Sequence, residues 1–331
     1  MKNLHSNIDN DIYKVKRYAL NLDDPPSIRW NNITDEYKEY FPLILQEIDT
    51  ILDSLGTIAK MAVLATVNTY EKTNMLMYRD ELRSISERAN ISLGKLILMQ
   101  LCYEMFSACT STGFKFNGNN AHFRTMDWDM PNLKKTTIEV EFKKNGQTLF
   151  IAPTFVGYVG IFTGVVKGSY SVSLNYRKSN GTLLENVKKA LGMVWPIGYL
   201  LRHSLEKGYD ITTLTKVLSE TKLISPCYIT IVSPQKDIIV LVRDSDTLVE
   251  KKISNEYLVQ TNNDAISTDN ILYSNERVKF ATDVIRSMNC DSYYELLKSF
   301  FAFPIINEET IYVSVMDSST GFVNTFIPKN N

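Results

Sequence analysis

The chain has 331 residues, of which 44% are apolar and 22% charged, and its formal net charge is -1. This length and composition are those of a globular protein with one large or two medium domains and a substantial core, and they exclude a disordered chain. A chain so close to neutral lacks the concentrated basic face that phosphate binding requires, so we expect no nucleic-acid partner.

The number of cysteines and the hydropathy of the chain limit its expected cellular compartment and its expected metal or disulfide chemistry. The four cysteines are scattered and form no CxxC pair, so the sequence predicts neither a disulfide framework nor a zinc site, and we expect no metal and no cofactor. The N-terminus has no apolar core of signal-peptide length, and no run of about 18 apolar residues predicts a membrane-spanning helix. We therefore expect a cytoplasmic protein with reduced thiols.

The N-terminal part is predicted to be mostly helical. After a short strand at 12–20, Pro42 can occupy the first turn of a helix in which Leu and Ile recur at helical spacing until Gly56 ends it. Ser92 is a suitable N-cap for the last of the helices that follow. These further helices are predicted at 57–72, 78–89 and 93–107.

After Cys109 the pattern changes to the period of strands, with Gly and Asn between the segments. Predicted strands are 109–116, 121–127, 137–143, 148–154, 159–166, 170–176, 227–233, 238–243, 257–261, 310–316 and 322–327. Predicted helices in this part are 183–206, 211–220, 275–287 and 291–300. Strand blocks separated by helices in one continuous chain predict an α+β fold in which two sheets pack face to face and helices cover them.

Cys109 lies where the apolar helix gives way to the first of these strands, and small residues on either side leave its sulfur reachable. A lone cysteine is usually a small buried hydrophobe. However, Arg124 and Asp127 follow on the next predicted strand, where a cation and a carboxylate can tune a thiol nucleophile if the two strands pair. Without further support, the same two charges could be an ordinary surface pair.

The base that would activate this thiol is an open question. A conventional cysteine hydrolase uses a histidine, and the chain offers His5, His122 and His203. His5 lies near the terminus and His203 in a predicted helix, whereas His122 shares a strand face with Arg124 and stays a candidate. The alternative base is the α-amine of Cys109 itself, available if the chain is cut before it, because an α-amino group titrates near pH ~8.

Several blocks along roughly residues 15–328 match one known family in the order of that family. They read NLDDPPSIRW, LILMQLCYEMFSACTST, FRTMDWD, FIAPTFVGYVGIFTGVVKGSYSVSLNYR, WPIGYLLRHSLE, TKLISPCYITI, VQTNND and SNER. Together they resemble the acid ceramidase and N-acylethanolamine acid amidase family. Members of that family are N-terminal-nucleophile cysteine hydrolases with a four-layer αββα fold, so the resemblance implies this fold for the chain.

The resemblance also implies an autoprocessing amidase. The chain would cut itself between Ala108 and Cys109, separating a helical segment, 1–108, from an αββα catalytic part, 109–331. The N-terminal segment would then be released or retained. Cys109 would attack the carbonyl of a substrate amide, and its new α-amine would shuttle the proton.

Four more residues receive catalytic roles from the same match. Arg124 would lie near the sulfur and favour the thiolate, and Asp127 would hold and orient the new ammonium. Asn262 would donate to the tetrahedral oxyanion, and Arg277 would fix the pocket around that asparagine. Without the resemblance, Asn262 is a turn residue in a polar loop and Arg277 is a charge at a helix start.

The implied substrate is an N-acylated lipid of the ceramide or N-acylethanolamine type, and we assign Trp128, Asn175 and Tyr176 to its binding. Tyr176 stands where the family usually has an acidic residue, which leaves the substrate preference open. Amphipathic segments at 43–55 and 58–67 could touch a membrane, although such stripes usually face the core. The alternatives are a non-lipid amidase of the bile-acid or penicillin type on the same fold, or an unprocessed, inactive relative that binds acyl lipids.

Overall fold

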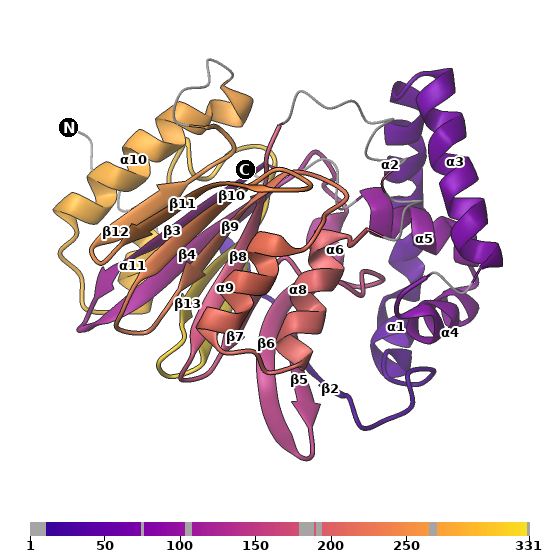
Figure 1. Ribbon diagram of the computed structural model, residues 1–331, viewed down its shortest axis with the longest axis horizontal. Helices are drawn as coiled ribbons and strands as arrows, with labels where there is room; N and C mark the ends of the chain where they lie inside the picture. The colour runs from indigo at the N-terminus through magenta and orange to yellow at the C-terminus, as the bar shows by residue number, and fades with distance from the viewer. Residues whose placement is uncertain are drawn as a thin grey trace.

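Two β-sheets lie face to face in the middle of the molecule, and helices cover their outer faces (Figure 1). This arrangement confirms the predicted α+β fold with αββα layers. The computed structural model describes residues 11–73, 76–102, 108–178, 189, 194–264 and 270–329.

One sheet has six strands, in the order β1-β14-β13-β4-β3-β12, and all its pairs are antiparallel. Its two longest strands, β3 and β4, meet at the Asn117-Gly118 turn, one of the Gly and Asn breaks expected between strands, and both turn residues have positive φ. The strands are β1 (Ile12–Lys14), β14 (Phe322–Pro328), β13 (Thr310–Asp317), β4 (Asn119–Asp127), β3 (Ala108–Phe116) and β12 (Tyr257–Gln260).

The other sheet has eight strands, in the order β11-β10-β9-β8-β7-β6-β5-β2. Its pairs are antiparallel except for β2 with β5, which run parallel at one edge. The strands are β11 (Leu248–Ser254), β10 (Ile238–Arg243), β9 (Cys227–Val232), β8 (Tyr170–Tyr176), β7 (Thr163–Val166), β6 (Gln147–Phe155), β5 (Thr137–Lys144) and β2 (Arg17–Asn21).

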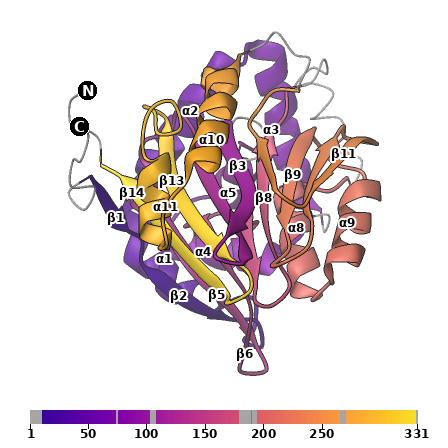
Figure 2. The same cartoon turned by 90° about the vertical axis from the view of Figure 1, so that its left-hand side faces the viewer.

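Two helices, α10 (Ser274–Ser287) and α11 (Tyr293–Phe300), cover the outer face of the six-stranded sheet (Figure 2). There Phe123 of β4 stacks on Phe300 with ring centroids 4.2 Å apart. The remaining helices lie on the side of the eight-stranded sheet. They are α1 (Asn31–Tyr37), α2 (Phe41–Ser54), α3 (Thr57–Lys72), α4 (Arg79–Ala89), α5 (Leu93–Cys102), α6 (Leu133–Thr136), α8 (Ile197–Glu206) and α9 (Ile211–Glu220). Two short 3-10 turns, η2 (Lys38–Tyr40) and η3 (Ile271–Tyr273), come directly before α2 and α10.

The predicted strand at 12–20 is in fact two strands that belong to different sheets. β1 pairs with β14 at one edge of the six-stranded sheet, and β2 pairs with β5 at one edge of the eight-stranded sheet. The short bend between them carries no Gly or Pro that would have marked it. The segment before Ala108 therefore contributes an edge strand to each sheet as well as a set of helices.

Other elements also differ from the sequence prediction. In the predicted helix 183–206, residues 194–196 are not helical and α8 begins only at Ile197, after Pro196. The strand β11 was missed because it is an exposed edge strand whose charged residues hide the alternation, and the short helix α1 was missed as well. The strand predicted at 159–166 begins only at Thr163. The predicted residues 103–107, 183–188 and 190–193 lie outside the described residues. No helix in the described part of the chain has both the length and the apolarity needed to cross a bilayer.

The two sheets lie in close contact at Gly113 of β3. A Cβ at this position would lie 2.6 Å from a methyl carbon of Ile238 and 2.7 Å from one of Val232, both on the eight-stranded sheet. No side chain fits in that gap, so glycine sets how near the sheets can lie. The same face of β3 carries Cys109 four residues earlier.

Candidate active site

The pairing of β3 with β4 fixes the position of Cys109. In the antiparallel register Cys109 lies opposite Met126, and Ser111 lies opposite Arg124. The Ser111 hydroxyl reaches Asn175 on β8, so this face of β3 looks into the space between the sheets, and alternation along the strand puts Cys109 on the same face. Cys109 is fully buried, and its Sγ lies 3.7 Å from Met126 Sδ.

Arg124 is the cation beside this sulfur. Its Nη2 lies 3.6 Å from Met126 Sδ, the atom that contacts Cys109, and its Nη1 donates to Asn175 Oδ1 at 3.3 Å. Burial by itself would lower the pKa of Arg124, but the neighbouring Cys109 and Tyr312 raise the pKa above its ordinary value. A guanidinium held here puts a positive charge beside the candidate nucleophile, and its effect on the sulfur stays a prediction.

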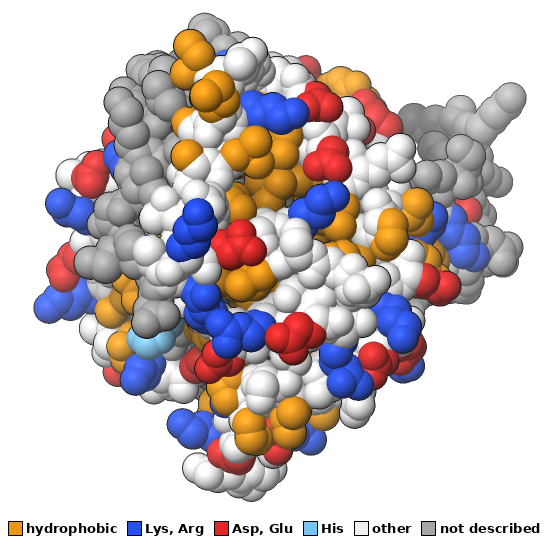
Figure 3. Space-filling model, turned by 90° about the vertical axis from the view of Figure 1, so that its right-hand side faces the viewer, with side chains coloured by type: hydrophobic (Ala, Val, Ile, Leu, Met, Phe, Trp, Pro, Cys, Tyr) orange, Lys and Arg blue, Asp and Glu red, His pale blue; other side chains and the backbone are white. Residues whose placement is uncertain are grey.

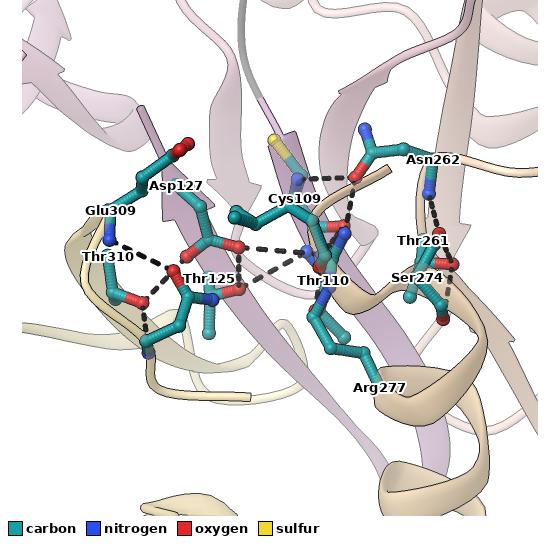
Figure 4. Close-up of polar contacts among 12 residues, drawn as sticks. Cys109, Thr110, Thr125, Asp127, Thr261, Asn262, Ser274, Arg277, Glu309 and Thr310 are labelled. Carbon is teal, nitrogen blue, oxygen red and sulfur yellow. Dashed lines mark hydrogen bonds and ion pairs between the residues drawn. The ribbon is translucent and has the colours of Figure 1, made fainter. Parts of the chain in front are cut away.

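Asn262 and Arg277 hold the backbone of Cys109 (Figure 4). The Cys109 N–H donates to Asn262 Oδ1 at 2.8 Å, and its carbonyl oxygen accepts from Arg277 Nη1 at 2.6 Å. Arg277 Nη2 donates to the same Asn262 Oδ1 at 2.9 Å. With its oxygen facing both donors, Asn262 directs Nδ2 to the Tyr176 carbonyl at 2.8 Å, and its own N–H donates to Ser274 Oγ.

Arg277 reaches these groups from the first turn of α10. Its Nε and Nη2 also donate to the carbonyl oxygens of Leu272 and Ile271, at 2.8 and 3.1 Å. Leu272 and Tyr273 have φ values of 41° and 58°, a left-handed conformation that costs energy for residues other than glycine. One guanidinium therefore holds both this strained turn and the strand of Cys109.

Asp127 lies on the face of β4 that is turned to α10, and it is fully buried. Its Oδ1 accepts from Thr310 Oγ1 at 2.9 Å, while its Oδ2 accepts from Thr125 Oγ1 at 3.2 Å and lies 3.5 Å from Arg277 Nη1. Burial raises the pKa of Asp127. In the intact chain Asp127 is connected to the backbone of Cys109 through Arg277, and its contact with a new ammonium stays a prediction.

A pocket of about 450 Å³ opens next to Ala108. Of the three residues assigned to substrate binding, Trp128 and Tyr176 belong to its wall. Asn175 lies behind the wall, where its Nδ2 donates to the Gln260 carbonyl at 2.9 Å. The wall is made of Ile51, Ser54, Leu55, Ala108, Trp128, Asp129, Tyr176, Ile271, Leu272 and Glu309.

Within the described residues, no histidine lies where it could act as the base for the Cys109 thiol. His122 shares the strand face of Arg124, but it lies four residues from Met126, about 13 Å along the strand. Burial lowers the pKa of His122 to about 3. His203 lies in α8 against the ring of Trp195, with ring centroids 5.2 Å apart, and His5 is outside the described residues.

A polar cluster that the sequence did not predict holds the loop of Asn262. Arg177 Nε and Nη2 donate to the two carboxylate oxygens of Asp264 at 2.9 and 2.7 Å, and the Tyr228 hydroxyl donates to Asp264 Oδ1 at 2.7 Å. The only signal for it was that opposite charges follow Tyr176 and Asn262 within two residues. Across the described ranges, no three His, Cys, Asp or Glu side chains gather closely enough to hold a metal ion.

Comparisons with known proteins agree with this architecture. Residues 13–66 match the family model described as the beta subunit of N-acylethanolamine-hydrolyzing acid amidase. The chain is 32% identical over 313 residues to an uncharacterized protein of Acanthamoeba polyphaga mimivirus, covering 90% of this chain and 95% of that protein. It is 27% identical over 346 residues to acid ceramidase of Heterocephalus glaber, covering 95% of this chain and 86% of the ceramidase.

A solved structure extends the similarity to the fold. The Caenorhabditis elegans N-acylethanolamine-hydrolyzing acid amidase ortholog superimposes with a TM-score of 0.55 at 26% sequence identity, covering 64% of this chain and 93% of that one. The similarity in sequence thus covers 95% of the chain, and the similarity in fold covers 64% of it. The chain belongs to the acid ceramidase and N-acylethanolamine-hydrolyzing acid amidase family.

Proposed function

We propose that this protein is an autoprocessing cysteine amidase that cleaves N-acylated lipids into a fatty acid and an amine, with Cys109 as the nucleophile. The relatives are named acid ceramidase and N-acylethanolamine-hydrolyzing acid amidase, so hydrolysis of a lipid amide is the activity they have in common. The observation that carries the proposal is the environment of the Cys109 nitrogen. That nitrogen lies in mid-chain, yet it already has a buried side-chain acceptor, Asn262 Oδ1, at 2.8 Å.

Self-cleavage would begin with attack of the Cys109 sulfur on the Ala108 carbonyl carbon. The C–N bond between the two residues then breaks, the nitrogen takes the proton, and a thioester joins Ala108 to the sulfur. Water hydrolyses the thioester, which leaves a carboxylate on Ala108 and a free thiol on Cys109. Because the Cys109 nitrogen already points to Asn262 Oδ1, the new amine would be oriented without rearrangement.

Cleavage would also uncover the nucleophile. Ala108 is part of the pocket wall, whereas Cys109 behind it is fully buried in the intact chain. The thiolate, favoured by Arg124, would then attack the substrate carbonyl and the α-amine would protonate the leaving amine. Asn262 would serve as oxyanion donor through its NH₂ group, which carries two donors.

The first prediction is that the protein is isolated as two fragments, 1–108 and 109–331, and that Cys109→Ala stays one chain without amidase activity. Intact mass and an assay with N-acyl amides check both statements. Cys290→Ala is the matched control, because that thiol is half-buried beside α11 and should leave cutting and activity unchanged. A wild-type chain that stays uncut and inactive would favour the acyl-lipid-binding alternative, and cutting in Cys109→Ala would refute the mechanism.

The pocket wall favours a lipid amide over the bile-acid or penicillin alternative. Most of the wall is apolar, which suits an acyl chain. Its charged members are Asp129 and Glu309, and burial together with the charge of Asp129 raises the pKa of Glu309. Conjugated bile acids and penicillins carry an anion on the amine side, which two carboxylates would repel.

We therefore expect an N-acylethanolamine to be hydrolysed with a kcat/KM at least about tenfold above that of the N-acylglycine with the same chain, because the glycine carboxylate meets like charge. Glu309→Gln should narrow this ratio. Glu308→Gln is the control, because the Glu308 side chain is outside the pocket wall and bonds the Tyr273 hydroxyl. Faster hydrolysis of the N-acylglycine would instead support the alternative.

The expected membrane contact would use α3 rather than α2. The apolar stripe of α2 is buried, but on α3 Ile58, Met61 and Leu64 are 76%, 65% and 44% exposed. These three lie at helical spacing on one face. Figure 3 shows the side of the molecule that carries the N-terminal helices, where hydrophobic side chains gather with charged ones around them.

Replacing Ile58 and Met61 together by serine should weaken association with phosphatidylcholine vesicles at least about tenfold, because each loses buried apolar area in the bilayer interface. Co-sedimentation measures this. Ile253→Ser, on the exposed edge strand β11 and 54% exposed, should bind vesicles as the wild type does. Equal binding by the double variant would exclude the α3 face as the contact.

A further inference from the structure

His122 lies completely buried between the two sheets, where the proposed mechanism does not use it. Its Nδ1 lies 2.9 Å from Ser171 Oγ, and its Nε2 lies 2.8 Å from Ser173 Oγ. The Ser173 hydroxyl donates to Ser111 Oγ at 2.7 Å, and the Ser111 hydroxyl donates to Asn175 Oδ1 at 2.6 Å. A continuous line of buried hydrogen bonds therefore joins His122 to Asn175.

The direction of this line follows from Asn175. Its Nδ2 faces the carbonyl oxygens of Gln260, Thr261 and Cys109 at 2.9, 3.2 and 3.4 Å, so its Oδ1 must face the Ser111 hydroxyl. Ser111 therefore spends its only hydrogen on Asn175, and it can only accept from the next hydroxyl.

Ser173 in turn spends its hydrogen on Ser111 and must accept from His122. The imidazole therefore carries a hydrogen on Nε2. Burial and the charge of Arg124 lower the pKa of His122 and keep the ring neutral, so Nδ1 has no hydrogen and accepts from Ser171. Both ring nitrogens are engaged, and nothing in this line can supply a base to the thiol.

At its Asn175 end, this line of hydrogen bonds contacts two groups beside the nucleophile, the Arg124 guanidinium and the Cys109 carbonyl. Asn175 Oδ1 also accepts from Arg124 Nη1 at 3.3 Å, and Asn175 Nδ2 reaches the Cys109 carbonyl. Asn175 thus links the cation beside the sulfur to the strand that carries the sulfur. Arg124 Nε has no hydrogen-bond partner among the described residues, so this bond to Asn175 is one of few that set the angle of the guanidinium.

Packing alone does not require polar side chains here. The same inter-sheet layer continues as an apolar cluster of Tyr228, Val240 and Val242 with Leu258. Breaking any one hydrogen bond of a polar line in such a layer leaves a buried donor or acceptor without a partner, which costs about 1–3 kcal/mol. Such a line therefore fixes one arrangement of its members.

We propose that His122, Ser173 and Ser111 form a directional relay that positions Asn175, and through it Arg124, for the chemistry of Cys109. The proposal rests on the proposed function, in which Arg124 activates the thiol. It makes His122 a positioning residue rather than a base. It also gives Asn175, which lies behind the pocket wall, a role that needs no contact with substrate.

Variants separate this role from simple packing. Ser111→Ala and His122→Leu interrupt the relay, and each should slow self-cleavage and lower kcat about tenfold with KM unchanged. His122→Gln can place an amide N–H near the position of Nε2 and should restore most of the rate. Thr230→Val is the matched control, because Thr230 lies opposite Ser173 on β9 with a buried hydroxyl that has no partner among the described residues.

A second readout does not depend on activity. In ¹⁵N-labelled Cys109→Ala protein, His122 should remain the neutral Nε2–H tautomer at pH 5, where an ordinary histidine is protonated. An Nδ1–H tautomer, or protonation at pH 5, would overturn the relay even if the protein is an amidase. Equal loss of rate in Thr230→Val and Ser111→Ala would show that the loss comes from disturbed packing between the sheets and not from the relay. If the wild type neither cuts itself nor hydrolyses amides while the tautomer is as stated, the proposed function and the positioning role fail together and only the hydrogen-bond line stands.

Discussion

Arg277→Lys is expected to slow both self-cleavage and amide hydrolysis at least about 100-fold, the size typical of losing one oxyanion donor, because Arg277 holds Asn262, the proposed donor, and the backbone of Cys109 in place. Lysine keeps the positive charge for Asp127, but an ammonium cannot reproduce a planar fork that reaches the Cys109 carbonyl and Asn262 Oδ1 together. It also cannot hold the carbonyls of the strained turn before α10. The fraction of cut chain over time, measured by intact mass, gives the rate.

Stability measurements separate this chemical effect from unfolding. In the uncut Cys109→Ala chain, Arg277→Met should cost about 3–5 kcal/mol of unfolding free energy, because the fully buried Asp127 loses its ion partner. Adding Asp127→Asn should return much of that loss, because it removes the uncompensated charge. With Cys109 present, the double variant should still fail to cut itself. Cutting at the wild-type rate in that variant would show that Arg277 has only a structural role.

Most element boundaries were predictable because local residues set them. Pro42 and Gly56 mark the two ends of α2, and the Asn-Gly pairs at 117–118 and 145–146 mark hairpin turns in which Asn and Gly take positive φ. The boundaries that failed depend on contacts far along the chain. β1 and β2 part into different sheets only because β14 and β5 are there to pair with them.

The candidate site shows the same division. The pairing of β3 with β4 that puts Arg124 near the sulfur was expected from two adjacent strand patterns. The contacts of Asn262 and Arg277 with Cys109, across 153 and 168 residues, could be expected only from the family resemblance. The serines of the relay look like ordinary strand residues in the sequence, because their partners come from the facing sheet.

Arg202→Met is expected to destabilise the uncut Cys109→Ala chain by about 3–5 kcal/mol, because it leaves Glu81 buried beside one fewer cation. Arg202 and Glu81 are 0% and 1% exposed, and the guanidinium donates to both carboxylate oxygens at 2.7 Å. Glu81 also accepts from Arg29 Nη1 at 2.9 Å and from Trp30 Nε1 at 2.6 Å. Chemical unfolding of the Cys109→Ala chain with and without Arg202→Met measures the difference in unfolding free energy.

A matched control lies on the same helix as Glu81. Arg88 pairs with Asp35, but the two side chains are 40% and 42% exposed, and both belong to the N-terminal segment. A solvated pair of this kind contributes about 0–1 kcal/mol, so Arg88→Met should change little. If Arg202→Met is as stable as Arg88→Met, the buried pair contributes nothing that packing does not already supply.

The buried pair has a further consequence if the chain cuts itself. Glu81, Arg29 and Trp30 lie before the proposed cut, whereas Arg202 lies after it in α8, so the ion pair crosses between the two fragments. The edge strands β1 and β2 cross in the same way. We therefore expect the segment 1–108 to be retained after cutting, and the fragments to elute together in size-exclusion chromatography.

In Arg202→Met the cut chain should lose fragment 1–108 under conditions that leave the wild-type complex whole. Once the covalent link is gone, loss of the ion pair weakens the association of the two fragments as well as the folding of the chain. Separation of the wild-type fragments on cutting would show instead that these contacts hold the segment only while the backbone is continuous.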